Sequence, residues 1–165
     1  MNNLFVGNII AFLASLIMVY TGILKDKKKI IYFQGIQIGL FVISNFVLGG
    51  VSGIIINIMN LIRNILCYKD RFFVKEKIFI IFITVILTLK FNNLGLIGLL
   101  PLIGSVIYTM FMNIKDVKKF KLLMIFTMVM WLIYDLSIKS YSSFLFDVLT
   151  ILANLISLFT VKNKE

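Results

Sequence analysis

The sequence has 165 residues, of which 61% are hydrophobic, and a formal net charge of +10; it contains one cysteine and no histidine. So large an apolar fraction excludes an ordinary soluble domain. A single cysteine excludes an intramolecular disulfide, and without histidine the usual metal sites and the commonest general base are absent.

Apolar segments of about 20 residues recur along the whole chain, which predicts an all-α, polytopic protein embedded in the lipid bilayer. No polar stretch between them is long enough for a second domain, so a single transmembrane domain over residues 1–165 is predicted. The seven predicted membrane spans cover roughly residues 3–24, 30–48, 52–68, 77–91, 94–113, 121–138 and 143–161.

The basic residues are unevenly distributed between the two sides of this arrangement. Of the 17 lysines and arginines, fourteen follow the first, third or fifth span or the last one, while Lys90 and Lys139 lie on the opposite side and Arg63 lies within a span. This predicts the N-terminus outside and the C-terminus in the cytoplasm. The lysine clusters are interpreted as topogenic charge that also attracts anionic lipid head groups, so no nucleic-acid partner is expected.

The chain also repeats itself. With a shift of 90 residues, residues 25–29 (KDKKK) fall on residues 115–119 (KDVKK), and Ser15 falls on Ser105. Spans one to three therefore correspond to spans five to seven, and span four is a connector that restores the orientation of the second unit. The predicted architecture is a 3+1+3 parallel repeat, with repeat one at about 3–70, a linker helix at about 77–91 and repeat two at about 94–161.

The third span carries a polar face within an apolar run. Asn57, Asn60 and Asn64 have the spacing i, i+3 and i+7, which places them on one side of a helix, and Arg63 lies beside them. A charge in the middle of a membrane costs roughly 3 kcal/mol on insertion scales, and such residues usually face a bundle interior or a water-filled cavity.

The seventh span repeats this face. Under the same shift the three asparagines of the third span correspond to Asp147, Thr150 and Asn154, whereas Arg63 corresponds to Ala153. Two such stripes that face each other across the axis between the repeats predict a solute cavity near the midplane. The alternative is that these groups only join helices, at about 0.6 kcal/mol for each interhelical hydrogen bond.

The sixth span adds two further candidates. Trp131 lies near mid-span, away from the membrane interface, and is interpreted either as an aromatic core residue or as a surface on which a ring stacks. Asp135 and Asp147 both lie one to two turns from the outer surface, and an ion pair between Arg63 and either of them is left open.

The fifth span contains Pro101 and Gly104. Proline removes a backbone hydrogen bond from a helix, so these residues predict a weakened or kinked region and a candidate hinge. Their counterparts in the first span are Ala11 and Ala14, so the signal is present in one half only.

With these residues in view, the sequence resembles the YgjV family of bacterial inner membrane proteins. The matching elements include Leu48-Gly49, residues 60–63 (NLIR), residues 100–105 (LPLIGS), Trp131 and Asn154. The 3+1+3 plan is similar to that of SWEET sugar transporters, PQ-loop proteins and PnuC-type vitamin transporters. That similarity implies alternating access by two three-helix units, with an asparagine on the third helix of each unit in contact with the solute.

These observations predict a transporter of a small polar solute in the bacterial inner membrane. Asn57, Asn60, Arg63 and Asn154 are the expected first contacts, and the guanidinium favours an anionic or carboxylate-bearing solute. The alternative is a receptor or an assembly partner on the same fold, and a homo-oligomer is left open. An enzyme is the least expected class, because no nucleophile–base pair and no metal cluster occurs at membrane depth; no cofactor or metal is expected.

Overall fold

The computed structural model describes residues 3–160, and within this range it is helical, with no strand. All seven predicted helical segments are present, so the all-α prediction is confirmed. The helices are α1 (Asn3–Ile23), α2 (Lys27–Leu48), α3 (Val51–Tyr68), α4 (Val74–Phe91), the 3-10 helix η1 (Ile97–Leu99), α5 (Leu100–Phe111), α6 (Val117–Ser137) and α7 (Tyr141–Thr160). The predicted C-terminal charges, Lys162 and Lys164, lie outside the described residues.

Five of these helices, α1, α2, α3, α6 and α7, are long and apolar enough to cross a membrane. The predicted fifth span over 94–113 is shorter in the structure, where the apolar helical segment runs from Ile97 to Phe111 through η1 and α5. At 1.5–2.0 Å per residue this segment is about 24 Å long, short of a hydrocarbon core of about 30 Å. α4 has 18 residues, among them charged Lys75, Glu76, Lys77 and Lys90. The structure thus supports a multi-pass membrane protein with five clear spans.

The repeated lysine–aspartate blocks serve the same purpose at two helix starts. The Asp26 side chain accepts a hydrogen bond from the backbone N–H of Lys29 (2.8 Å) at the start of α2. The Asp116 side chain accepts one from the backbone N–H of Lys119 (3.0 Å) at the start of α6. Each aspartate satisfies an N–H that has no partner within the helix, which is the normal role of an N-cap residue.

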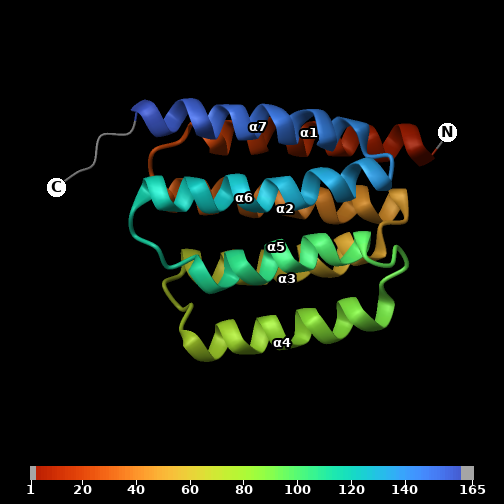
Figure 1. Cartoon of the computed structure of the whole chain (residues 1–165), viewed down its shortest axis with the longest axis horizontal. Helices are drawn as coiled ribbons and strands as arrows, with labels where there is room; N and C mark the ends of the chain where they lie inside the picture. Colours follow the sequence, from red (N-terminus) through yellow and green to blue (C-terminus); the bar gives the residue numbers. More distant parts are fainter. Residues whose placement is uncertain (1–2, 161–165) are drawn as a thin grey trace.

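Six helices form a closed ring. α1 packs on α2, α2 on α3, α3 on α5, α5 on α6, α6 on α7 and α7 on α1, while α4 packs against α3 and α5. In Figure 1 α7, α6 and α5 lie over α1, α2 and α3, with α4 at the lower edge. α1 begins and α7 ends at opposite ends of the bundle. Which end faces the cytoplasm stays a prediction.

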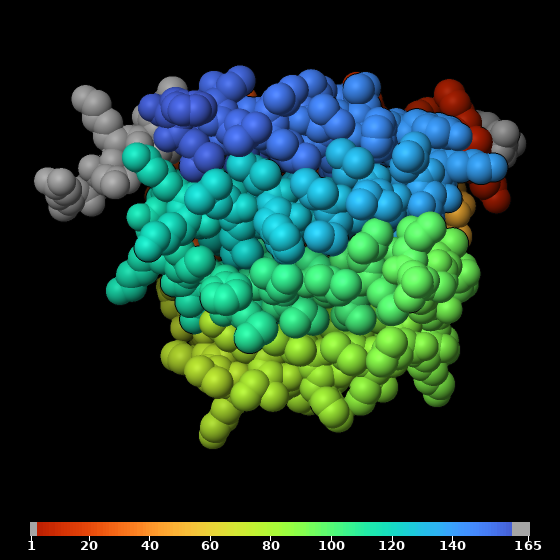
Figure 2. Space-filling model, viewed as in Figure 1, coloured from red at the N-terminus to blue at the C-terminus, as the bar shows by residue number. Residues whose placement is uncertain are grey.

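The outside of the bundle is apolar. Figure 2 shows one face built from successive bands of α7, α6, α5 and α4. Large apolar side chains point outward along the helices, among them Phe46, Phe79 and Phe82, whose exposed fractions are 75%, 63% and 62%. A surface of this kind is unfavourable in water and suits the hydrocarbon of a bilayer.

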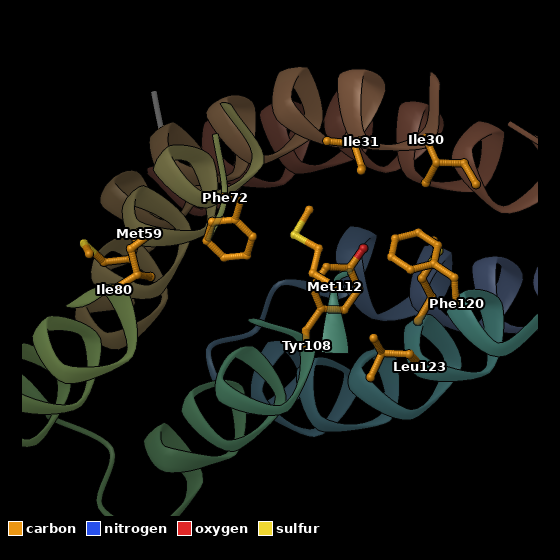
Figure 3. Packing of buried hydrophobic residues seen from close by; sticks show 10 residues of the cluster. Ile30, Ile31, Met59, Phe72, Ile80, Tyr108, Met112, Phe120 and Leu123 are labelled. Carbon is orange, nitrogen blue, oxygen red and sulfur yellow. The ribbon is translucent and has the colours of Figure 1, made fainter. Parts of the chain in front are cut away.

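One end of the ring is closed by a cluster of apolar side chains, where α2 and α6 begin and α3 and α5 end. Figure 3 shows Tyr108 of α5 and Met112, which directly follows α5, between Phe72 and Phe120. The other members of the cluster are Ile30, Ile31, Met59, Ile80, Leu123 and Met124. The cluster therefore joins these helices at one end of the ring.

Two lysines connect helices at the same end of the ring. Lys27 Nζ, at the start of α2, donates to the carbonyl oxygens of Met112 (2.5 Å) and Ile114 (2.8 Å), just beyond α5. Lys121 Nζ in α6 donates to the carbonyl of Gly22 (2.5 Å) near the end of α1. Carbonyls at helix C-termini lack intrahelical donors and attract cations. The interpretation of Lys121 as a loop charge is therefore wrong: its exposed fraction is 0%.

Replacing Lys121 with methionine is expected to lower the free energy of unfolding by about 1.5–3 kcal/mol, the range for hydrogen bonds to charged groups. The substitution keeps an apolar stem of similar length but leaves the Gly22 carbonyl without its donor. Thermal unfolding of the detergent-purified protein measures the effect. The control is Lys119→Met, since the Lys119 side chain is exposed; equal melting temperatures for the two variants would contradict the prediction.

Candidate functional site

The ring encloses a cavity of about 70 Å³. At roughly 15 Å³ for each water molecule it has room for about five. All six ring helices contribute to its lining, and most of the polar groups come from α2, α3, α5 and α6. A cavity with polar side chains on its wall, inside an apolar bundle, is the natural place to look for a solute site.

Arg63 of α3 lines this cavity, with an exposed fraction of only 3%. Its Nη1 donates to Asn60 Oδ1 (2.9 Å) and Thr109 Oγ1 (3.2 Å). Its Nε and Nη2 donate to Asn64 Oδ1 (3.2 and 3.1 Å). The guanidinium is thus fixed on the cavity wall by neutral oxygen atoms of its own helix and of α5.

Tyr108 of α5 makes a cation–π contact with the Arg63 guanidinium. The Tyr108 ring lies under the Arg63 guanidinium, with 4.5 Å between the guanidinium carbon and the ring centroid. The Tyr108 hydroxyl donates to Gln34 Oε1 of α2 (3.0 Å), and Ser105 Oγ donates to Asn60 Oδ1 (2.6 Å). A ring face attracts a cation but carries no negative charge.

No carboxylate of the described residues neutralises Arg63. Within residues 3–160 the one ion pair joins Lys28 to Asp70 on the surface, so Arg63 pairs with neither Asp135 nor Asp147. The four hydrogen bonds of Arg63 use four of its five N–H groups, and in the described part of the chain one N–H on Nη2 has no partner. A buried charge without a counter-charge costs several kcal/mol, which an anion in the cavity would offset.

A pair of carboxyl groups lines another part of the same cavity. Asp135 of α6 and Asp147 of α7 have exposed fractions of 6% and 2%, and their side chains lie close to each other. Asp147 Oδ2 has no hydrogen-bond partner among the described residues. The cavity therefore has a cationic group and an acidic pair, both buried.

Several polar groups on the wall have no partner among residues 3–160. Gln37 Oε1 and Asn45 Oδ1 of α2 are buried and accept no hydrogen bond. Asn57 of α3, also on the wall, has no hydrogen bond from its side chain to any described residue. Buried polar groups are normally satisfied, so unpaired groups that face a cavity indicate a site for water or a solute.

Comparison with known proteins gives the family. The model of the family Imp-YgjV, described as bacterial inner membrane proteins, matches residues 5–165. The chain belongs to the Imp-YgjV family. No curated protein and no solved structure matches it significantly. The resemblance to YgjV proteins is thus confirmed, and the family together with the apolar helices supports a multi-pass protein of the bacterial inner membrane. The similarity to SWEET transporters is not confirmed, since no solved structure matches the chain.

In this Imp-YgjV protein the structure brings together six of the nine predicted binding residues. They share the lining of one cavity although they come from three helices: Asn57, Asn60, Arg63, Trp131, Asp135 and Asp147. Trp131 also packs edge-to-face on Tyr134, with 5.7 Å between ring centroids, while its role as a surface on which a solute ring stacks stays a prediction.

The other three candidates do not line the cavity. Asn64 supports Arg63 from behind. Thr150 donates to the carbonyl of Phe146 (2.8 Å), and Asn154 Nδ2 donates to the carbonyl of Thr150 (2.9 Å), both within α7. The expectation of two symmetric stripes that face each other is therefore wrong for α7. Because α7 packs on α1 and α6, most of its polar face is buried there and only Asp147 reaches the cavity.

The predicted hinge residues also lie differently in the Imp-YgjV fold. Pro101 lies in the first turn of α5, directly after η1, where its missing N–H interrupts no intrahelical bond, so it causes no kink within α5. The weakened region and hinge expected at Pro101 stay a prediction. Gly104 lines the cavity, and a Cβ there would lie 3.4 Å from Met130 Cβ of α6. Movement at this junction stays a prediction.

Two wall residues were missed by the sequence-based reasoning. Gln34 was not predicted because it lies near the start of a mainly apolar helix. It nevertheless shares one helix face with other residues of the cavity lining, namely Gln37, Ile38, Phe41 and Asn45. Tyr108 was not predicted because aromatic residues are common in membrane helices. Its spacing of three residues from Ser105 was the available signal.

Proposed function

We propose that this Imp-YgjV protein transports a small solute with a carboxylate or similar anionic group across the inner membrane, and that the solute binds in the central cavity. Arg63 carries this proposal, because its buried guanidinium lines the cavity without a counter-charge and with an N–H available. A guanidinium is well suited to a carboxylate, since its parallel N–H groups match the two oxygen atoms.

The proposed mechanism is alternating access by two three-helix units, α1–α3 and α5–α7, joined by α4. The order of the ring supports it, because each contact has a counterpart under the 90-residue shift: α1–α2 with α5–α6, α2–α3 with α6–α7, and α3–α5 with α7–α1. The equivalent N-caps Asp26 and Asp116 support it as well. Repeat-built transporters bind their solutes at such an interface between units.

The contacts at the closed end suggest what has to move. The cluster around Met112 and the contacts of Lys27 and Lys121 all lie where α2 and α6 begin, and both lysines connect one unit to the other. With the predicted orientation this is the cytoplasmic end. Release to the cytoplasm therefore requires these contacts to open while those at the other end close.

A ligand screen tests the proposal. The detergent-purified protein is heated with small carboxylates, and each acid is matched by its neutral amide; sugars and vitamins complete the panel. A ligand at 100 times its Kd stabilises by about 2.7 kcal/mol, which a melting curve resolves. We expect carboxylates to raise the melting temperature and their amides to have no effect. Uptake of the stabilising solute into proteoliposomes is then measured, and we expect it to occur. Stabilisation by no member of the panel would contradict transport and favour a receptor or assembly partner.

A further inference from the structure

We infer that the cavity has a second subsite, formed around Asp135, Asp147 and Gln37, which binds an ammonium group, so that the solute is a small zwitterion of the amino-acid class. The inference rests on the proposed function, from which it takes the carboxylate site at Arg63. It adds a binding site for the positively charged end of the same solute.

The first observation is the acidic pair itself. Asp135 and Asp147 lie on different helices, both line the cavity, and both are more than nine-tenths buried. Asp147 Oδ2 accepts no hydrogen bond from any described residue, and across residues 3–160 no lysine or arginine forms an ion pair with either carboxyl group. An ammonium group in the cavity would hold one carboxyl of the pair in its ionised form, which no basic side chain of this range does.

The second observation is independent of the carboxyl groups. Gln37 and Asn45 line the same cavity with exposed fractions of 5% and 4%, and their Oε1 and Oδ1 atoms have no donor among residues 3–160. Asn45 Nδ2 donates to the carbonyl of Phe41 (2.9 Å), which fixes Oδ1 as the unsatisfied atom. An ammonium group has three donors and no acceptor, so it satisfies such a set where an anion does not.

The third observation is the size and division of the cavity. Arg63 lies more than 4.0 Å from either carboxylate, yet all three groups line one space of about 70 Å³. The Arg63 side chain points back toward the start of α3, since it donates to Asn60 one turn earlier. A space with room for about five water molecules admits only a small solute, so the two charged groups of that solute are few atoms apart.

Charge and hydrogen bonding together then select the solute class. The cavity holds one positive group, Arg63, and an acidic pair, Asp135 with Asp147, beside acceptor atoms that have no donor among residues 3–160. A zwitterion supplies an anion for the first and an ammonium donor for the second. A simple carboxylate leaves the buried acceptors without a donor and a simple amine leaves Arg63 uncompensated, and both are disfavoured because unpaired buried groups are costly.

Equilibrium binding to the detergent-purified full chain tests the inference. The probes are glycine, β-alanine, 4-aminobutyrate and the standard amino acids, with propionate and propylamine as probes that carry one charge each. The tightest amino acid is expected to bind at least roughly twentyfold more tightly than propionate or propylamine, the effect of a buried charge pair. Asp147→Asn is expected to weaken amino-acid binding by a similar factor and to change propionate binding by less than about threefold.

The matched control is Thr150→Val, one turn further along α7 and outside the cavity lining, which should leave all affinities unchanged. If Asp147→Asn does not fold, Asp135→Asn is measured in the same way, and the comparison of probes on the unaltered protein is decisive alone. Equal affinity for propionate and amino acids, or equal affinities in the aspartate variant, overturns the inference and leaves carboxylate transport intact. A chain that binds none of the probes overturns both.

Discussion

Replacing Arg63 with glutamine is expected to abolish stabilisation by the carboxylate solute and its uptake, while the protein remains folded in the membrane. The guanidinium lines the cavity, and it is held by Asn60, Asn64 and Thr109 without any carboxylate. Removing the charge takes away the solute's counter-charge. It also removes a desolvation cost from the empty protein, so the two effects on the free energy have opposite signs.

The expected loss of affinity is about 2–5 kcal/mol, which corresponds to roughly thirtyfold or more. The melting temperature without ligand should stay within a few degrees of the original, because glutamine can still donate to one of the asparagines. Arg71→Gln is the matched control, since Arg71 is exposed after the end of α3. Binding measurements and melting curves on both variants check the prediction. Loss of folded protein in Arg63→Gln alone would mean that the arginine is structural.

Replacing Gly53 with alanine is expected to destabilise the fold by about 1–3 kcal/mol, the usual cost of overpacking. A Cβ at Gly53 would lie 2.6 Å from Asn45 Oδ1 and 2.8 Å from the Tyr134 hydroxyl. Tyr134 is fully buried and accepts a hydrogen bond from the Gly53 N–H (2.8 Å), so it has no room to move away. The substitution therefore strains the junction of α2, α3 and α6.

The control for Gly53→Ala is the same substitution at Gly39. A Cβ at Gly39 meets no atom within 4 Å, and alanine is favoured over glycine in a helix by about 1 kcal/mol. Thermal unfolding in detergent should therefore show a lower melting temperature for Gly53→Ala and an unchanged or higher one for Gly39→Ala. Equal melting temperatures would show that the junction tolerates a methyl group.

The helices of this protein were predictable because the interactions that form them lie within each segment of the chain. A run of about 20 apolar residues is stable across a bilayer only with its backbone bonds satisfied within the segment. The caps of α2 and α6 were also encoded locally, in the repeated Lys–Asp blocks, although their capping role is visible only in the structure. The charge of Arg63, in the middle of such a run, correctly marked the interior of the bundle.

The start of α5 was not predictable from hydropathy. Residues 94–100 are as apolar as a span, but Asn92 Oδ1 accepts hydrogen bonds from Leu94 N and Ser52 Oγ (both 3.0 Å), and its Nδ2 donates to the Gly95 carbonyl (2.6 Å). Gly95 has a positive φ of 55°. These bonds offer the backbone an alternative to the helix, and one of them comes from α3, far away in the sequence.

The sequence by itself determined the number of helices, the membrane environment and the existence of a polar face on α3. Only the tertiary structure decided which polar faces share a cavity. A helical pattern gives the direction of a face but not the neighbour it meets, and that neighbour depends on the order of the ring. For this reason Gln34 and Tyr108 join Arg63 at the cavity, whereas Asn154, with the same spacing as Asn64, is buried within the packing of α7 instead.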